Sequence, residues 1–163
     1  MLVCLSCNEI YDNNLKNKLK KARVRSAGFV YDYLVCPKVN CRQYIADIDE
    51  LFVPLIITLR NKDYNTQFCC SGHYGTYCSS YIAITGKCYI SSIPDGCTLE
   101  IDNNYDRYII RRNFDETLTM NDLYKEIMTN VQNMMGWAES IPQNIPRDNK
   151  EFLEKFNREN VNE

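Results

Sequence analysis

The chain has 163 residues, the length of one ordinary domain or of a small domain with an appendage. Its 45% hydrophobic and 25% charged content excludes a disordered chain, and its net charge of −2 excludes a uniformly cationic nucleic-acid coat. No stretch reaches the roughly 20 apolar residues of a membrane helix. Because the start has neither the charged leader nor the cleavage site of a signal peptide, we expect a soluble, cytoplasmic protein.

Four of the nine cysteines form two close pairs near the start of the chain. Two residues separate Cys4 from Cys7, four separate Cys36 from Cys41, and 28 lie between the pairs. In a reducing compartment, clustered cysteines bind metal more often than they form disulfides. Two close pairs joined by a β-hairpin can supply the four thiolates that Zn²⁺ prefers. We therefore predict a structural Zn²⁺ site of Cys4, Cys7, Cys36 and Cys41; the alternative is four unrelated reduced cysteines.

The segments around these cysteines predict a hairpin and a helix. Residues 24–35 are rich in β-branched and aromatic side chains on either side of Ala27-Gly28, which is typical of a short hairpin. A helix is predicted from Asp47, an N-cap residue with Glu50 three positions later. Its apolar face consists of Leu51, Leu55, Ile56 and Leu59. Pro54 lies too deep in this helix, which indicates a kink or a boundary displaced by a turn.

The remaining pattern predicts a meander of strands and then helices. Short strands are expected at 64–70, 80–85, 87–91, 98–102 and 105–112, with turn residues between them. A helix follows at 121–135, capped by Asn121 or Thr119 and stopped by Gly136. A charged helix at 149–160 follows a linker. We therefore predict an α+β fold, in which a small zinc ribbon precedes a mainly antiparallel sheet packed with two to three helices. The predicted domains are 1–46, 47–138 and 139–163.

Basic residues are concentrated in the N-terminal head. Residues 1–48 have a charge balance of +4, whereas the rest of the chain has −6. Six cations lie between the cysteine pairs and, with neighbouring aromatic residues, predict a surface that follows phosphates and stacks on bases: Lys16, Lys18, Lys20, Lys21, Arg23 and Arg25, with Tyr11, Phe29, Tyr31 and Tyr33. Two alternatives are a docking surface for a protein partner and a solvated face that keeps the head soluble.

The only histidine lies in a second group of reactive residues, Cys69 to His73. We interpret Cys70, Ser71, Gly72 and His73 as a ligand- or anion-binding loop, because the Ser71-Gly72 amides can form an anion nest. The alternatives are a second metal site that includes Cys78, a Cys/His nucleophile, and a loop with a structural role alone. Because side chains alternate along a strand, at most one of Cys69 and Cys70 enters this site.

Other chemistry-bearing residues have structural interpretations. Cys88 and Cys97 lie in strand-like segments and are expected to be buried. A cluster of methionines and one tryptophan is expected in the core: Met128, Met134, Met135 and Trp137. Basic and aromatic residues of the 105–112 segment form either a groove or a solvated sheet face: Tyr105, Arg107, Tyr108, Arg111 and Arg112. No P-loop, dinucleotide fingerprint or catalytic carboxylate pair is present.

Between residues 49 and 82 the chain carries a series of short motifs: Asp49-Glu50, Leu55-Ile56, Thr66, Cys70-Ser71-Gly72 and Tyr81-Ile82. This order resembles the wybutosine-synthesis tRNA methyltransferase family, which has a helix started by Asp-Glu, a Thr, and a Ser-Cys-Ser-Gly-Arg loop before a strand; His73 stands at the Arg position. Residues 1–85 are also similar to uncharacterised phage and Firmicute proteins that join a zinc ribbon to a Cys-Cys-Ser-Gly-His loop. The resemblance implies an α/β core with the Cys70-Ser71-Gly72 loop on its surface.

We expect the protein to act by binding rather than by turnover. Eighteen asparagines, together with the lysines, are typical of translation from an AT-rich genome. The leading hypothesis is a zinc-binding accessory protein of a phage or mobile element, active in the host cytoplasm. Its basic head and its Cys-Ser-Gly-His loop would engage nucleic acid, a nucleotide or a host protein complex, for example to inhibit a bacterial defence system. The alternative is an RNA-modifying enzyme that resembles the methyltransferase family.

Overall fold

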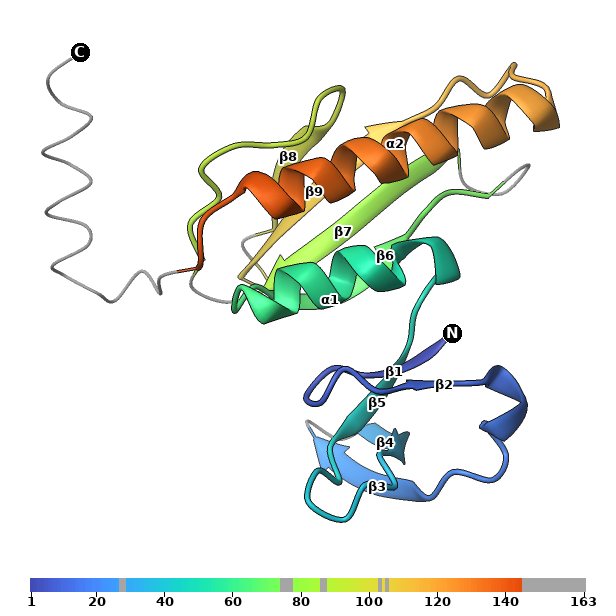
Figure 1. Ribbon diagram of the computed structural model, residues 1–163, viewed down its shortest axis with the longest axis vertical. Coiled ribbons are helices and arrows are strands. Elements are labelled where there is room, and N and C mark those ends of the chain that lie inside the picture. The colour runs from blue at the N-terminus through green and yellow to red at the C-terminus, as the bar shows by residue number, and fades with distance from the viewer. Residues whose placement is uncertain (27–28, 74–77, 86–87, 103, 105, 145–163) are drawn as a thin grey trace, which may run out of the picture. The chain divides into compact units, whose positions relative to one another are not determined.

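The computed structural model of the protein describes residues 1–26, 29–73, 78–85, 88–102, 104 and 106–144 (Figure 1). The chain divides into two compact units, Met1–Val53 and Pro54–Glu163. The described residues form two antiparallel sheets and two α-helices, which confirms the predicted α+β class. The helix predicted at 149–160 lies outside the described residues. Neither described helix combines the length and the hydropathy needed to cross a bilayer.

The first unit, called the head below, contains a five-stranded antiparallel sheet with the order β2-β1-β5-β4-β3. The strands are β1 (Leu2–Cys4), β2 (Ile10–Tyr11), β3 (Lys21–Ser26), β4 (Phe29–Val35) and β5 (Tyr44–Asp47). β3 and β4 form the predicted hairpin, in a register that opposes Ala22 to Tyr33; its tip, residues 27–28, lies outside the described residues. The other three strands extend this hairpin into a sheet.

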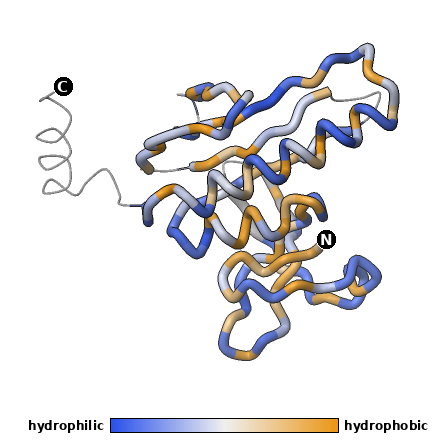
Figure 2. Tube along the Cα trace, turned by 45° about the horizontal axis from the view of Figure 1, so that its top comes forward, coloured by the Kyte–Doolittle hydropathy of each residue, from blue (hydrophilic) through white to orange (hydrophobic). Residues whose placement is uncertain are grey.

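The interior of the head is small and is rich in the predicted metal ligands. One core cluster contains buried Leu2, Cys4, Cys36 and Ile45, against which Cys7, Tyr11, Leu19, Leu34 and Cys41 pack. Figure 2 shows the start of the chain as a continuous hydrophobic segment, and this segment supplies β1. Because a unit of this size buries little apolar surface, the cysteine cluster at its centre is expected to contribute much of its stability.

The helix predicted from Asp47 begins later than expected. Asp47 is the last residue of β5, and Asp49 caps a 3₁₀ turn, η2 (Glu50–Phe52), by accepting a 3.2 Å hydrogen bond from the Leu51 amide. Helix α1 then spans Val53–Asn61. Pro54 is therefore the second residue of α1, where its missing N–H breaks no intrahelical bond. Of the two predictions made for Pro54, the displaced helix boundary is therefore confirmed, and Pro54 requires no kink in α1.

The second unit contains a four-stranded antiparallel sheet with the order β6-β7-β9-β8 and the long helix α2. The elements are β6 (Asn65–Cys70), β7 (Ser79–Thr85), β8 (Thr98–Asp102), β9 (Arg107–Asn113) and α2 (Met120–Ser140). The Asn130 amide of α2 donates a buried 2.9 Å hydrogen bond to the Ser80 hydroxyl of β7. Ile82 of β7, its β9 partner Ile110, and Met134 of α2 are all buried.

Two details of the second unit differ from the prediction. Residues 88–91 form no strand, because this segment interacts with side chains instead: the Tyr89 carbonyl accepts a hydrogen bond from the Tyr64 hydroxyl. Helix α2 does not stop at Gly136. Burial of Trp137 outweighs the cost of a helical glycine, about 1 kcal/mol, and the Lys62 ammonium donates to the carbonyls of the final turn. Thr119, rather than Asn121, caps the start of α2.

Candidate metal centre

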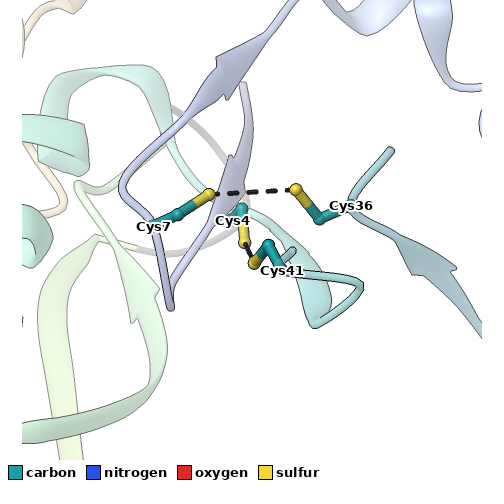
Figure 3. Close-up of side chains that lie close together, drawn as sticks. All are labelled: Cys4, Cys7, Cys36 and Cys41. Atoms are coloured by element: carbon teal, nitrogen blue, oxygen red, sulfur yellow. Dashed lines mark hydrogen bonds between the residues drawn. The ribbon is translucent and has the colours of Figure 1, made fainter. Parts of the chain in front are cut away.

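The four predicted ligands converge in the head. The Sγ atoms of Cys4 and Cys41 lie 3.5 Å apart, those of Cys7 and Cys36 lie 3.8 Å apart, and all four lie within 4.8 Å of one another. Figure 3 shows the four side chains directed toward one another. Four sulfurs at the Zn–S distance of about 2.3 Å form a tetrahedron with edges of about 3.8 Å. None of the nine cysteines forms a disulfide, so the cluster can hold a metal ion.

The two cysteine pairs lie on turns with the same hydrogen-bond pattern, despite their different spacing. The amide of the first cysteine in each pair donates at 2.9 Å to a carbonyl two positions after the second cysteine, Cys4 to Glu9 and Cys36 to Gln43. The residue after each second cysteine, Asn8 or Arg42, has a left-handed backbone. The two extra residues between Cys36 and Cys41 therefore lengthen the second turn without changing how it ends.

The thiols differ in their electrostatic surroundings. Burial raises the pKa of Cys4 to about 12, although the amides of Ser6 and Cys7 act in the opposite direction. The backbone amide of Gln43 is the main cause that lowers the pKa of Cys41 to about 7. Burial raises the pKa of Cys7. A cluster in which burial disfavours some thiolates requires a cation to become fully ionised, so metal binding and proton release are coupled.

Tyr11 supports the cluster, a role that sequence reasoning missed. Its hydroxyl lies 3.1 Å from the Sγ of Cys36. Burial is the main cause that raises the pKa of Tyr11, so the phenol stays protonated and can donate to a thiolate. The ring is half-buried against the head core, which corrects its assignment as an exposed base-stacking residue. The contact between its hydroxyl and Cys36 joins residues 25 positions apart, and the sequence contained no signal for it.

Tyr11→Phe is expected to weaken metal affinity about 10-fold, because hydrogen bonds to ligand atoms tune metal binding by roughly 10–100-fold. The ring remains to fill the core, so the head should still fold. Competition between the protein and a chromophoric zinc chelator measures the affinity. Tyr44→Phe is the matched control, since Tyr44 is half-exposed on β5 outside the cluster. Equal affinities for the two variants would contradict the role assigned to the Tyr11 hydroxyl.

Two of the predicted cations whose side chains the structure describes form ion pairs with carboxylates of the head. Lys16 forms a 2.7 Å ion pair with Asp47, and Arg23 a 2.8 Å pair with Asp32. In the β3–β4 register, Lys21 occupies the same face as Arg23. Lys18 and Lys20 form no ion pair with a carboxylate in the described part of the chain. The side chain of Arg25 lies outside the described residues.

Lys18 and Lys20 line a pocket of about 520 Å³ beside the cysteine cluster. Its third cation is Arg42, which follows the ligand Cys41 and also forms no ion pair in the part of the chain that the structure describes. No acidic side chain is among the lining residues, which are Lys18, Leu19, Lys20, Ala22, Tyr33, Val35, Cys36, Pro37 and Arg42. Cys36 belongs both to the cysteine cluster and to the wall of the pocket, so the pocket directly adjoins the cluster.

Residues 70–73, which the sequence predicts to be a ligand-binding loop, pack closely against other residues of the second unit. Ser71 and Gly72 are buried, and Gly72 has a φ of +104°. A Cβ on Gly72 would lie 3.0 Å from the Phe114 ring and 3.5 Å from Ile127. A ring nitrogen of exposed His73 lies within 4.8 Å of Cys70 Sγ. Close packing is therefore sufficient to explain the glycine, and ligand binding by this loop stays a prediction.

Among the described residues, neither Cys69 nor Cys78 has its sulfur within 4.8 Å of both the Cys70 sulfur and a ring nitrogen of His73. The structure therefore does not assemble the predicted second metal site that includes Cys78.

The other candidate residues have structural partners. Cys88 and Cys97 are buried as expected, but neither lies in a strand. Arg107 and Arg111 form ion pairs with Asp102 and Glu100 of the adjacent strand β8. Arg112 pairs with Glu126 of α2, and Tyr108 is buried, while Tyr105 lies outside the described residues. These contacts favour a solvated, ion-paired sheet face over a basic groove. Met134 and Trp137 are buried in the core.

Comparison of the chain with models of known protein families finds no match, and neither curated proteins nor solved structures give one.

Proposed function

We propose that the head is a zinc-stabilised module that binds nucleic acid through the pocket beside its cysteine cluster. The observation that carries this proposal is the gathering of Lys18, Lys20 and Arg42 around one pocket without an acidic lining residue. These three cations form no ion pair among the residues that the structure describes, so they create a positive potential that attracts polyanions. Tyr33 in the same wall adds an aromatic surface on which a base can stack.

Zinc is the metal we propose for the cluster. Four thiolate donors at tetrahedral spacing are the preferred set for structural Zn²⁺, and they leave no open coordination position for catalysis. The metal would therefore hold the knuckles that carry Cys36, Pro37 and Arg42, and with them one side of the pocket. Nucleic-acid binding is consequently expected to depend on the metal, although the metal itself would not contact the nucleic acid.

A nucleic acid suits this pocket better than an acidic protein surface. Carboxylates of a protein partner would also satisfy the cations, but a part of the wall is apolar: Leu19, Ala22, Val35 and Pro37. A nucleotide offers a phosphate for the cations and a flat base for this apolar part, whereas a flexible acidic side chain offers only the charge. The combination of charge and apolar wall therefore favours a nucleotide-containing ligand.

Replacement of the three pocket cations by glutamine, K18Q/K20Q/R42Q, is expected to lower affinity for a fluorescein-labelled 12-residue RNA about 50–100-fold at low salt. Each lost phosphate contact should also reduce the slope of log K against log [salt] by about 0.7, or about 2 in total. Fluorescence anisotropy at several salt concentrations measures both quantities. Zinc content and circular dichroism confirm that the variant is folded.

The matched control is K16Q/R23Q/K38Q, which removes the same charge from the head at cations that are paired with Asp47, Asp32 and Glu9. This variant is expected to retain affinity within about 5-fold, since only general electrostatic attraction is reduced. Equal losses in the two triple variants would show that net charge, rather than the pocket, determines binding. Absence of RNA binding by the unaltered protein would refute the proposed function.

A further inference from the structure

The pocket has the dimensions of a site for one small molecule rather than of a groove for a duplex. Its volume of about 520 Å³ lies within the range of roughly 300–1,000 Å³ of sites that bury a single small ligand. Phosphates of a duplex can contact surface cations, but its bases remain stacked within the helix. A pocket of this size on a nucleic-acid-binding head therefore suits a nucleotide whose base is unpaired.

The wall of the pocket includes a flat, rigid surface. Ala22 and Tyr33 are opposed in the β3–β4 pairing, and Val35 follows two positions later on the same face. The Tyr33 ring packs edge-to-face against the Tyr44 ring, with centroids 6.0 Å apart and planes at 70°. This contact fixes the orientation of Tyr33 before any ligand binds. A preorganised aromatic ring loses little entropy when a base stacks on it.

Charge and apolar surface lie on different segments of the chain. Lys18 and Lys20 belong to the turn that precedes β3, and Arg42 belongs to the second knuckle, whereas Tyr33 and Val35 are in β4. A ligand that contacts all of them must therefore combine an anionic group with an apolar, planar group. A nucleoside 5′-monophosphate has this combination, and inorganic phosphate has only the anionic part.

We infer that the pocket binds one unpaired nucleotide, with its phosphate at Lys18, Lys20 and Arg42 and its base against Tyr33. This inference rests on the proposed nucleic-acid binding and narrows it to single-stranded substrates. The nucleotide unit can come from an unpaired residue of a strand or from a free nucleotide. Both sources present the same phosphate and base, so the experiment below includes a separate arm for each.

The experiment compares three probes with the full-length, zinc-loaded protein: a 12-residue single-stranded RNA, a 12-base-pair RNA duplex, and adenosine 5′-monophosphate. The single strand is expected to bind at least 10-fold more tightly than the duplex. Tyr33→Ala should weaken single-strand binding about 10-fold or more, the effect of losing one stacked base, and should leave duplex affinity and the salt slope unchanged. Tyr33→Phe keeps the ring and should retain single-strand affinity.

Adenosine monophosphate that displaces the labelled strand from the unaltered protein, but not from the Tyr33→Ala variant, supports the free nucleotide as a source. If adenosine monophosphate does not displace the labelled strand, but Tyr33→Ala still weakens single-strand binding, the pocket binds a nucleotide only as part of a strand. Equal affinity for strand and duplex, together with no effect of Tyr33→Ala, would overturn the inference. In that case a loss of binding in K18Q/K20Q/R42Q would leave the proposed function standing, so the two failures are distinguishable.

Tyr33→Ala also requires a folding control, because its ring packs against Tyr44. Zinc content and the dispersion of head signals in an NMR spectrum report whether the variant is folded. Tyr124→Ala, at an exposed position of α2 in the second unit, is the matched loss of a tyrosine elsewhere and should retain affinity for every probe. If Tyr33→Ala is misfolded, Tyr33→Leu provides the test, because leucine fills the site without an aromatic face.

Discussion

Cys4→Ser is expected to remove the metal from the protein and to unfold the head, while the second unit keeps its structure. Structural zinc contributes about 10–16 kcal/mol of apparent binding free energy near neutral pH, and the core cluster in the described part of the head includes all four cysteines of the group. The loss is therefore comparable to the total stability of about 5–15 kcal/mol that is typical of a folded domain, which is enough to unfold a unit as small as the head. NMR spectra should lose the dispersed signals of the head, and elemental analysis should find no bound zinc.

The control for this experiment is Cys78→Ser. Cys78 is half-buried, directly precedes β7 and lies outside the four-cysteine group, so the variant should keep one zinc per chain and a folded head. A zinc chelator added to the unaltered protein should reproduce the Cys4→Ser spectrum. A Cys4→Ser protein that retained both its zinc and its dispersed head signals would contradict the structural role of the cluster.

Gly72→Ala is expected to lower the free energy of unfolding of the second unit by about 2–6 kcal/mol. A φ of +104° is a backbone conformation that alanine rarely adopts, and the added Cβ would lie 3.0 Å from the Phe114 ring. Strained backbone and overpacking each cost about 1–3 kcal/mol. Urea denaturation followed by fluorescence measures the change, because the single tryptophan, Trp137, is buried in the second unit.

Gly136→Ala is the matched control. Gly136 lies within α2, and a Cβ there would meet no atom within 4 Å. Alanine at a helical position is favoured over glycine by about 1 kcal/mol, so this variant should be slightly more stable than the unaltered protein. If Gly72→Ala unfolded at the same urea concentration as the unaltered protein, the loop would be less tightly packed than described, and its role as a ligand-binding loop would gain weight.

The cluster could be predicted from the sequence because its signal is local. Two close cysteine pairs with a β-rich spacer between them were sufficient to name the four residues and the hairpin, and the structure brings these residues together. The remainder of the head sheet could not be predicted. β1 and β2 have three and two residues, too few for a periodic pattern, and the pairing of β1 with β5 joins segments more than 40 positions apart.

The basic pocket shows the same limit at the level of side chains. The run from Lys16 to Arg25 predicts a cationic segment, but no sequence pattern separates Lys18 and Lys20 from Lys16 and Arg23, which form ion pairs with carboxylates. Arg42 was missed because it lies 22 residues from Lys20 and only the second knuckle brings it to the pocket. Its position directly after a predicted ligand was the one available signal.

Helix boundaries failed where tertiary contacts overrode local preference. Gly136 is a reasonable stop signal by itself, yet buried Trp137 and the hydrogen bonds from Lys62 extend α2 to Ser140. Likewise, Asp47 is a good cap residue, but β5 uses it as its last position and leaves the cap to Asp49. In both cases, residues distant in sequence decided between two locally acceptable structures.

The most direct test of the central claim is native mass spectrometry of the full-length protein mixed with the 12-residue single-stranded RNA. We expect a complex of one chain, one zinc ion and one RNA for the unaltered protein, and one chain with one zinc ion but no RNA for K18Q/K20Q/R42Q. A chain without zinc, or a triple variant that retains RNA as well as the unaltered protein does, would contradict a zinc-stabilised head that binds nucleic acid through its basic pocket.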